Sequence, residues 1–248
     1  MDKIYMPILT RLLDDSESDE LEKQQLLQEF QDIIGIIILL AVPLSVNALS
    51  LFLEIGPDKI SNRLDSFRSV LSVPGDRDLP VRILHLSFRD FLVQSRSKFH
   101  VDKRQKHTAI TNFCLRTMRS RLQKDICDLA SPGTRRADIN DQYICQHLPP
   151  ELQYSCRYWV YHLEQSRPLS SEIGDVRLFL QKHFLHWFEA MSLLGLISEV
   201  VGMLDLLHTV IQGNNDTVLV DFLLDARRFV LKNRRIADKA PFRFIVQD

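Results

Sequence analysis

Apolar residues in the first part of the chain recur at three- and four-residue steps and then become continuous. In LEKQQLLQEFQDIIGIIILL, residues 21–40, the Leu, Ile and Phe positions fall on one side of a helix. This spacing predicts an amphipathic helix that becomes wholly buried towards its end. A second short helix is predicted over SVNALSLFLEIG, residues 45–56, and is expected to close at Gly56.

The uncharged stretch from Ile33 to Leu53 is as long as a membrane span. Whether it forms one continuous helix therefore decides between a membrane span and a buried core. A bilayer core needs about 20 predominantly apolar residues in one continuous helix. Pro43 interrupts this stretch, and Ser45 and Asn47 follow it as helix-capping residues. We therefore expect two buried helices that meet at the proline in a soluble core, and no membrane partner.

Beyond this pair the pattern changes from helix to strand and back. Pro57 and Asp58 are N-terminal signals for a third helix. Two short β-rich runs, SVLSV and VRILHL, then flank the turn PGDRDLP and predict a β-hairpin. Another helix is expected to begin at Ser87, because Asp90 lies at the spacing of a capping box with a shortened acid.

Helix, helix, helix, hairpin, helix is the element order of a winged-helix domain, which we place at 20–98. Residues 1–19 are interpreted as the end of an upstream helix and a linker. From 99 to 248 only helical patterns follow, including a pair of helices broken near Gly195. The predicted fold is mainly α: a winged-helix domain with one small β-hairpin, followed by an antiparallel helical array.

Composition narrows the class of protein. A formal net charge of −1 excludes the global basic field with which many proteins bind nucleic acid or anionic membranes. The 4 cysteines form no CxxC pair and fit reduced, mostly buried thiols of a cytoplasmic protein. The N-terminal sequence MDKIYMPILTRLL lacks the features of a secretory signal, so a cytoplasmic location is expected.

Motifs that carry catalysis do not occur in the sequence. GxxxxGK[ST], GxGxxG and GxSxG are all absent. A zinc site would have to use Cys145, His147 and Cys156, and a fourth ligand is lacking. His183 and His186 share a helix face without an HExxH motif, so solvated or core histidines are expected. We expect no enzyme activity and no metal.

Two basic features keep a nucleic-acid alternative open. The third helix of a winged helix can enter the major groove of DNA, and here it offers Lys59, Arg63 and Arg68 together with nearby acidic residues. The segment ARRFVLKNRRIADK, residues 226–239, could bind an acidic partner or nucleic acid, or could be a solvated helix face. A stand-alone winged-helix DNA-binding regulator is therefore the alternative function.

The sharpest motif is VRILHLSFRDFL, residues 81–92, in which a strand brings His85 to the corner where the next helix begins. Backbone N–H groups at a helix N-terminus, together with an imidazole, favour an anion such as a phosphate. A core histidine that locks the hairpin to the helix fits the same residues equally well.

PVRILHLSFRDFL resembles the winged-helix signature of NACHT-type STAND proteins, the NLR-like family, and above all of its fungal vegetative-incompatibility (HET-type) members. Further segments resemble the same family in the same order: IIGIIILLAVPLSVNALSLFL, LDSFRSVLSVP, KHTAITNFCLRTM, LPPELQYSCRYWVYHL and DARRFVLKNRRIADKAP. The resemblance thus covers nearly the whole chain.

This resemblance implies a regulatory module of a nucleotide-dependent switch that acts in heterokaryon incompatibility and innate immunity. In the family, the winged-helix histidine touches the β-phosphate of ADP bound to an upstream NACHT domain, and His85 is the matching residue. Ser87, Phe88, Asp90 and Phe91 match the interdomain and structural part of the motif. The implied partners are a NACHT domain, in cis in a parent protein or in trans, and a homologous NLR-like protein.

The resemblance begins after the position of the NACHT domain and ends before the C-terminal repeats. We therefore expect a non-catalytic fragment without the NTPase core and the sensor repeats. Such a fragment has no cofactor of its own and contacts ADP or ATP only together with a NACHT domain. An apolar surface should be exposed where that domain would pack.

Overall fold

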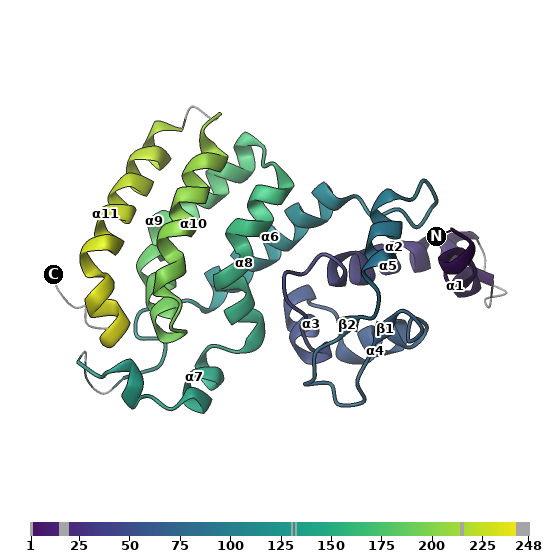
Figure 1. Cartoon of the computed structure of the whole chain (residues 1–248), viewed down its shortest axis with the longest axis horizontal. Helices are drawn as coiled ribbons and strands as arrows, with labels where there is room; N and C mark the ends of the chain where they lie inside the picture. The colour runs from purple at the N-terminus through teal and green to yellow at the C-terminus, as the bar shows by residue number, and fades with distance from the viewer. Residues whose placement is uncertain (1, 15–19, 130, 132, 214–215, 242–248) are drawn as a thin grey trace. The chain divides into compact units, whose positions relative to one another are not determined.

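The computed structural model describes residues 2–14, 20–129, 131, 133–213 and 216–241. Helices predominate in this part of the chain, and its one sheet has two antiparallel strands, which confirms a mainly α fold with a small β-hairpin (Figure 1). The chain divides into two compact units, Met1–Ala109 and Ile110–Asp248. The winged-helix assignment and the domain limits 1–19, 20–98 and 99–248 stay predictions.

The first unit contains five helices and the hairpin among its described residues. These elements are α1 (Asp2–Asp14), α2 (Glu20–Ile37), α3 (Val46–Leu53), α4 (Pro57–Asp65), β1 (Leu71–Ser72), β2 (Arg82–Ile83) and α5 (Leu86–Gln94).

The uncharged stretch forms two helices, as its capping residues predicted. The chain leaves the helical conformation between α2 and α3, and the Ser45 hydroxyl accepts a hydrogen bond from the Ala48 N–H (3.1 Å) at the start of α3. The prediction that Gly56 closes α3 was wrong, because Glu54 adopts the left-handed conformation (φ 58°) two residues earlier. Gly56 instead precedes Pro57, the first residue of α4. None of the helices formed by the described residues has both the length and the apolar character needed to cross a bilayer.

The hairpin is short and is held at several points. Leu71 pairs with Ile83, and Ser72 pairs with Arg82. Its connecting loop is fastened to the start of α3, where the Asn47 N–H donates to the Arg77 carbonyl (3.1 Å). These contacts fix the strand that leads into the motif at 81–92.

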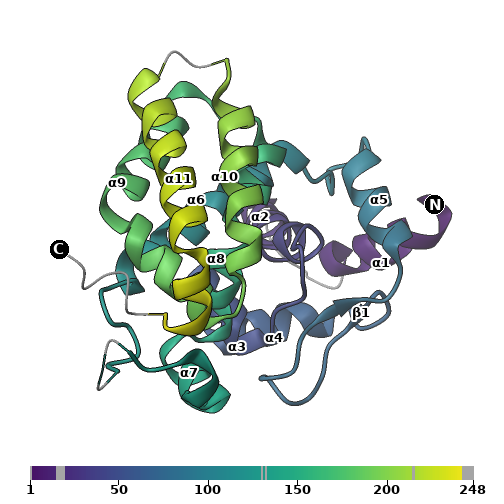
Figure 2. The ribbon, with the colours of Figure 1, turned by 60° about the vertical axis from the view of Figure 1, so that its left-hand side comes forward.

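The second unit is entirely helical in its described residues. Its elements are the larger part of α6 (Lys103–Arg121), a 3₁₀ turn η1 (Arg136–Asp138), α7 (Asp141–His147), α8 (Pro150–Ser166), α9 (Ser170–Leu193), α10 (Ile197–Ile211) and α11 (Thr217–Lys239). Figure 2 shows α9, α10 and α11 running alongside one another. Gly195, at φ 71°, lies between α9 and α10, as predicted for a break between two helices.

Two tryptophans lie at the centre of the second unit. Trp159 of α8 and Trp187 of α9 are completely buried, and their rings meet edge to face with centroids 5.8 Å apart. The indole N–H of Trp187 donates to the Cys156 carbonyl (2.9 Å). Burial of each large aromatic side chain stabilises the fold by about 2–3 kcal/mol, so this pair is a main source of stability in the unit.

Candidate functional site

The motif at 81–92 forms the end of the hairpin, a sharp corner and the first two turns of α5. Val81 is buried, and its N–H donates to the Leu44 carbonyl (2.9 Å). After β2, the Leu84 N–H donates to the Val70 carbonyl (3.0 Å), which continues the pairing for one more residue. The hairpin therefore determines where His85 lies.

His85 lies at the corner between strand and helix, as the sequence predicted. It is the N-cap residue of α5, in extended conformation (φ −136°, ψ 122°), and its carbonyl accepts from the Phe88 N–H (3.0 Å). The prediction that α5 begins at Ser87 was wrong, because its first helical residue is Leu86. The imidazole makes no capping hydrogen bond and is exposed, which overturns the alternative of a core histidine.

Large apolar side chains flank His85 on the same exposed corner. Leu84 is 49% exposed and Leu86 is 69% exposed. The corner thus combines an imidazole, the positive end of the α5 dipole and apolar surface. This combination suits a contact that includes both a protein surface and an anionic group.

Three other residues of the motif, Ser87, Phe88 and Phe91, hold α1. Phe88 and Phe91 are buried, and the Tyr5 ring of α1 lies 5.3 Å and 5.4 Å from them, centroid to centroid. The Tyr5 hydroxyl and the Ser87 hydroxyl share a hydrogen bond of 2.7 Å. Asp90 is partly exposed and lies 3.7 Å from the Arg89 guanidinium. The sequence did not single out Tyr5, although an aromatic residue among the aliphatic positions of that helix is a usable signal.

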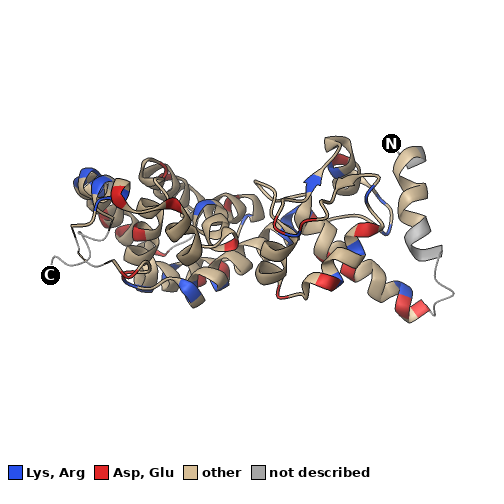
Figure 3. Cartoon of the chain, turned by 90° about the horizontal axis from the view of Figure 1, so that it is seen from below, with Lys and Arg blue, Asp and Glu red and all other residues tan. Residues whose placement is uncertain are grey.

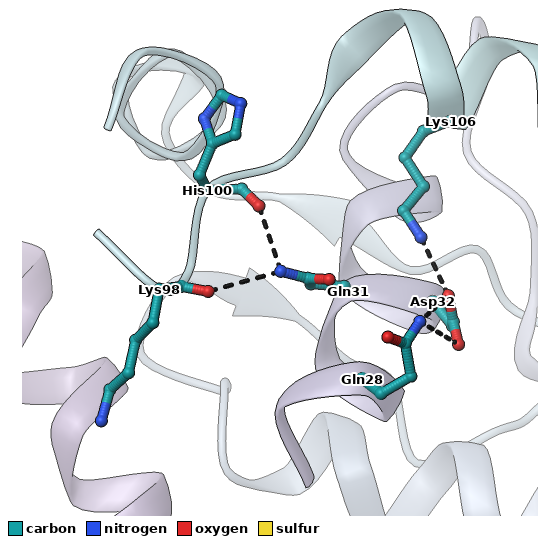
Figure 4. Close-up of polar contacts among 6 residues, drawn as sticks. All are labelled: Gln28, Gln31, Asp32, Lys98, His100 and Lys106. Atoms are coloured by element: carbon teal, nitrogen blue, oxygen red, sulfur yellow. Dashed lines mark hydrogen bonds and ion pairs between the residues drawn. The ribbon is translucent and has the colours of Figure 1, made fainter. Parts of the chain in front are cut away.

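Polar side chains of α2 fasten the segment that follows α5 (Figure 4). The Gln31 amide donates to the carbonyls of Lys98 and His100, at 3.3 Å each. The next residue, Asp32, binds the buried ammonium group of Lys106 through its carboxylate at 2.8 Å. Gln28 also donates to both Asp32 oxygens. These contacts fix the start of α6 within the first unit, and the local sequence pattern gave no sign of them.

The cations proposed to read DNA are engaged in ion pairs. Lys59 and Arg63 both bind the Glu29 carboxylate, with 2.7 Å from Lys59 Nζ and 2.7 Å from Arg63 Nε. Burial alone raises the pKa of Glu29, but the hydrogen bonds from these two cations outweigh it, so this pKa lies below its usual value. Arg68 pairs with Asp65. Such pairing lowers the positive charge that α4 can offer to phosphates.

In the second unit, α9 turns a row of titratable residues towards the segment after α6. His183 and Glu189 are buried, and His186 is half-buried. The Asp125 N–H donates to one Glu189 oxygen (3.2 Å). Burial raises the pKa of Glu189 to about 8 and lowers the pKa of both histidines. The row is therefore mainly uncharged at neutral pH, and it holds the segment in place.

In the described part of the chain, no three His, Cys, Asp or Glu side chains lie close enough together to hold a metal ion. Among the three residues considered as zinc ligands, Cys145 is exposed and Cys156 is buried, and the His147 ring bonds to the Tyr143 carbonyl. The cysteines are free and mostly buried, as predicted. Burial raises the pKa of the Cys114 thiol to about 12, so this thiol is unreactive.

Comparison with known proteins finds similarity to a vegetative incompatibility protein along nearly the whole length of the chain. This relative is Vegetative incompatibility protein HET-E-1 of Podospora anserina, which is 26% identical over 268 residues covering 97% of this chain. The chain spans 19% of the length of that relative. No protein-family profile matches the chain, and no solved structure matches it.

Proposed function

We propose that this chain is a non-catalytic regulatory and interaction module of a NACHT-type signal-transduction NTPase. In this proposal the first unit contains a winged-helix domain, and the second is the helical region that follows it. The observation that carries the proposal is the similarity to an incompatibility protein along 97% of the chain. The match to the family motif at 81–92 adds a specific site to this overall similarity.

His85 is proposed to sense the nucleotide that a NACHT domain holds. Its imidazole is exposed at the N-terminus of α5, where a β-phosphate would meet both the ring and the positive end of the helix dipole. The exposed side chains of Leu84 and Leu86 would pack against the NACHT domain around this contact. The chain itself is proposed to bind ADP or ATP only in that complex.

Coupling between the two units is proposed to pass along α6. The boundary between the units falls within this helix, between Ala109 and Ile110. In the first unit, Lys106 is buried against Asp32. In the second unit, Ile110 and Met118 are buried in the core. One helix thus contributes to both units, which suits an element that transmits a change of state.

Release of a fluorescent ADP analogue from a separately purified NACHT domain of a fungal incompatibility protein tests this proposal. Addition of the wild-type chain should slow release, because a hydrogen bond from His85 to a phosphate is charge-assisted. The factor by which the chain slows release should be about tenfold smaller for His85→Ala than for the wild type. His100→Ala is the matched control, since His100 is also an exposed histidine of the first unit.

Two results would contradict the proposal. One is release at the same rate with the wild-type and His85→Ala chains, both shown to bind the NACHT domain. The other is ATP hydrolysis by the purified chain alone, which a non-catalytic module cannot perform.

A further inference from the structure

The solvent-facing side of α11 carries exposed charged residues at alternating steps of four and three from Asp221 to Lys239, with Leu224 and Leu231 beside them. The opposite side of this helix is buried through Leu219, Leu223, Ala226 and Val230. Residues at such spacing lie on one face of a helix. We call this face the outer α11 row, and its members are Asp221, Leu224, Asp225, Arg228, Leu231, Lys232, Arg235 and Lys239.

Charge is ordered along the outer α11 row. Its first half carries acidic residues and its second half carries cations, which gather beside the end of the described chain in Figure 3. Arg228 pairs with Asp225 of the same helix (3.1 Å). Within the described residues, Lys232, Arg235 and Lys239 have no acidic partner. The row thus presents cations that no described residue of its unit neutralises.

Apolar side chains accompany these charges. Leu224 is 41% exposed and Leu231 is 49% exposed. Ile236, at the edge of the row, is 37% exposed. A helix face that mixes leucines at this spacing with ordered charges is typical of a helix that pairs with another helix.

We propose that the outer α11 row binds a second copy of this chain through an antiparallel pairing of the two α11 helices. A sequence of charges that runs from acidic to basic is complementary to its own reverse. Centred on Arg228, which has Asp225 of its own helix as a partner, such a pairing brings Asp221 close to Arg235 of the second copy and Asp225 close to Lys232. Leu224 then lies beside Leu231 of the second copy. The same surface is used twice, as a two-fold interface requires.

Other occupants fit the row less well. Asp221 and Asp225 lie in the same row as the cations and would repel the phosphates of nucleic acid or of an anionic membrane. A membrane-surface helix also needs a continuous apolar face, whereas here Leu224 and Leu231 alternate with charged residues. A second copy meets Asp221 and Asp225 with cations and meets Lys232 and Arg235 with carboxylates.

Sedimentation velocity of the full chain, over a range of concentrations at low salt, tests this proposal. The wild-type chain should move from monomer towards dimer, and about 1 M salt should weaken the dimer because screening then acts within about 3 Å. Asp221→Lys/Asp225→Lys and Lys232→Asp/Arg235→Glu should each weaken self-association about tenfold or more. An equimolar mixture of the two variants should restore the dimer, because every reversed charge then meets its opposite.

Glu22→Lys/Asp175→Lys is the matched control, since it changes two exposed acidic residues in the same way outside the row and should leave the dimer unchanged. Circular dichroism establishes that each variant is folded. The proposal is overturned if the wild-type chain stays monomeric up to about 1 mM, or if the mixture fails to restore a dimer. Salt-sensitive binding of a duplex DNA or of phosphatidylserine vesicles by a chain that remains monomeric would equally overturn it.

Discussion

The Tyr5 hydroxyl lies 2.7 Å from the Ser87 hydroxyl, although the two residues are 82 positions apart in the chain. This hydrogen bond joins the first helix to the motif that carries His85. The aromatic rings of Phe88 and Phe91 complete the contact on the buried side. The residues that hold α1 thus lie in the first two turns of α5, directly after His85, the residue proposed to sense a nucleotide.

Tyr5→Ala should destabilise the first unit by about 3 kcal/mol, because a buried aromatic ring is removed from between two others. Tyr5→Phe and Ser87→Ala should each cost about 1 kcal/mol by removing one hydrogen bond. The double variant Tyr5→Phe/Ser87→Ala should cost little more than either single change. Urea denaturation of the wild-type chain and the four variants measures these losses, and fully additive losses for Tyr5→Phe and Ser87→Ala would show that the hydrogen bond contributes nothing.

Asp32 and Lys106 should respond unequally to substitution. Asp32→Asn leaves the buried ammonium group without its carboxylate and should cost about 1–3 kcal/mol. Lys106→Met keeps an apolar stem in the same place and leaves Asp32 partly exposed with its Gln28 contacts, so it should cost less than about 1 kcal/mol. Chemical denaturation gives both values, and equal losses would contradict this account of the pair.

Glu189 should make the stability of the second unit depend on pH. Its pKa rises from the ordinary value of 4.5 to about 8, so the folded chain keeps a proton that the unfolded chain has lost between these limits. The free energy of unfolding should therefore fall as pH rises through this window, by up to about 1.4 kcal/mol per pH unit. Glu189→Gln should remove this slope.

The histidines of the same row act in the opposite direction. The pKa values of His183 and His186 are lowered, so below about pH 6.5 the unfolded chain takes up protons first and stability falls as pH falls. The difference between wild-type and Glu189→Gln chains isolates the carboxyl group. If the difference in the free energy of unfolding between the two chains stays constant between about pH 5 and pH 8, Glu189 titrates normally.

Ser45→Ala should cost about 1 kcal/mol, because the hydroxyl satisfies the Ala48 N–H at the start of α3. Ser72→Ala is a suitable control, since Ser72 lies on the exposed side of β1. Thermal unfolding of the two variants and the wild type measures the difference. Equal transition temperatures for all three chains would exclude a stabilising cap.

Local signals in the sequence predicted the features that depend on neighbouring residues. Pro43 and Ser45 marked the break between α2 and α3, and the strand before His85 marked the corner at α5. The end of α3 was mispredicted because Glu54 adopts the left-handed conformation that glycine usually takes. Where a helix or turn makes its own hydrogen bonds, spacing and residue type thus placed its ends to within one or two residues.

Contacts between distant segments could not be predicted in this way. Gln31 meets the carbonyls of Lys98 and His100 across more than sixty residues, and nothing near Gln31 in the sequence indicates that contact. The sequence likewise left open whether His85 is buried or exposed, because that depends on which elements cover the corner. The tertiary structure resolved this point by leaving the imidazole in solvent.

We propose that this chain binds a NACHT domain and responds to the nucleotide that the domain holds. Both parts are measured by calorimetric titration of the wild-type chain into a fungal NACHT domain, loaded first with ADP and then with a non-hydrolysable ATP analogue. We expect a one-to-one complex that is about tenfold tighter with ADP, and a loss of this preference in His85→Ala. Absence of binding, or equal affinity in both nucleotide states, would contradict it.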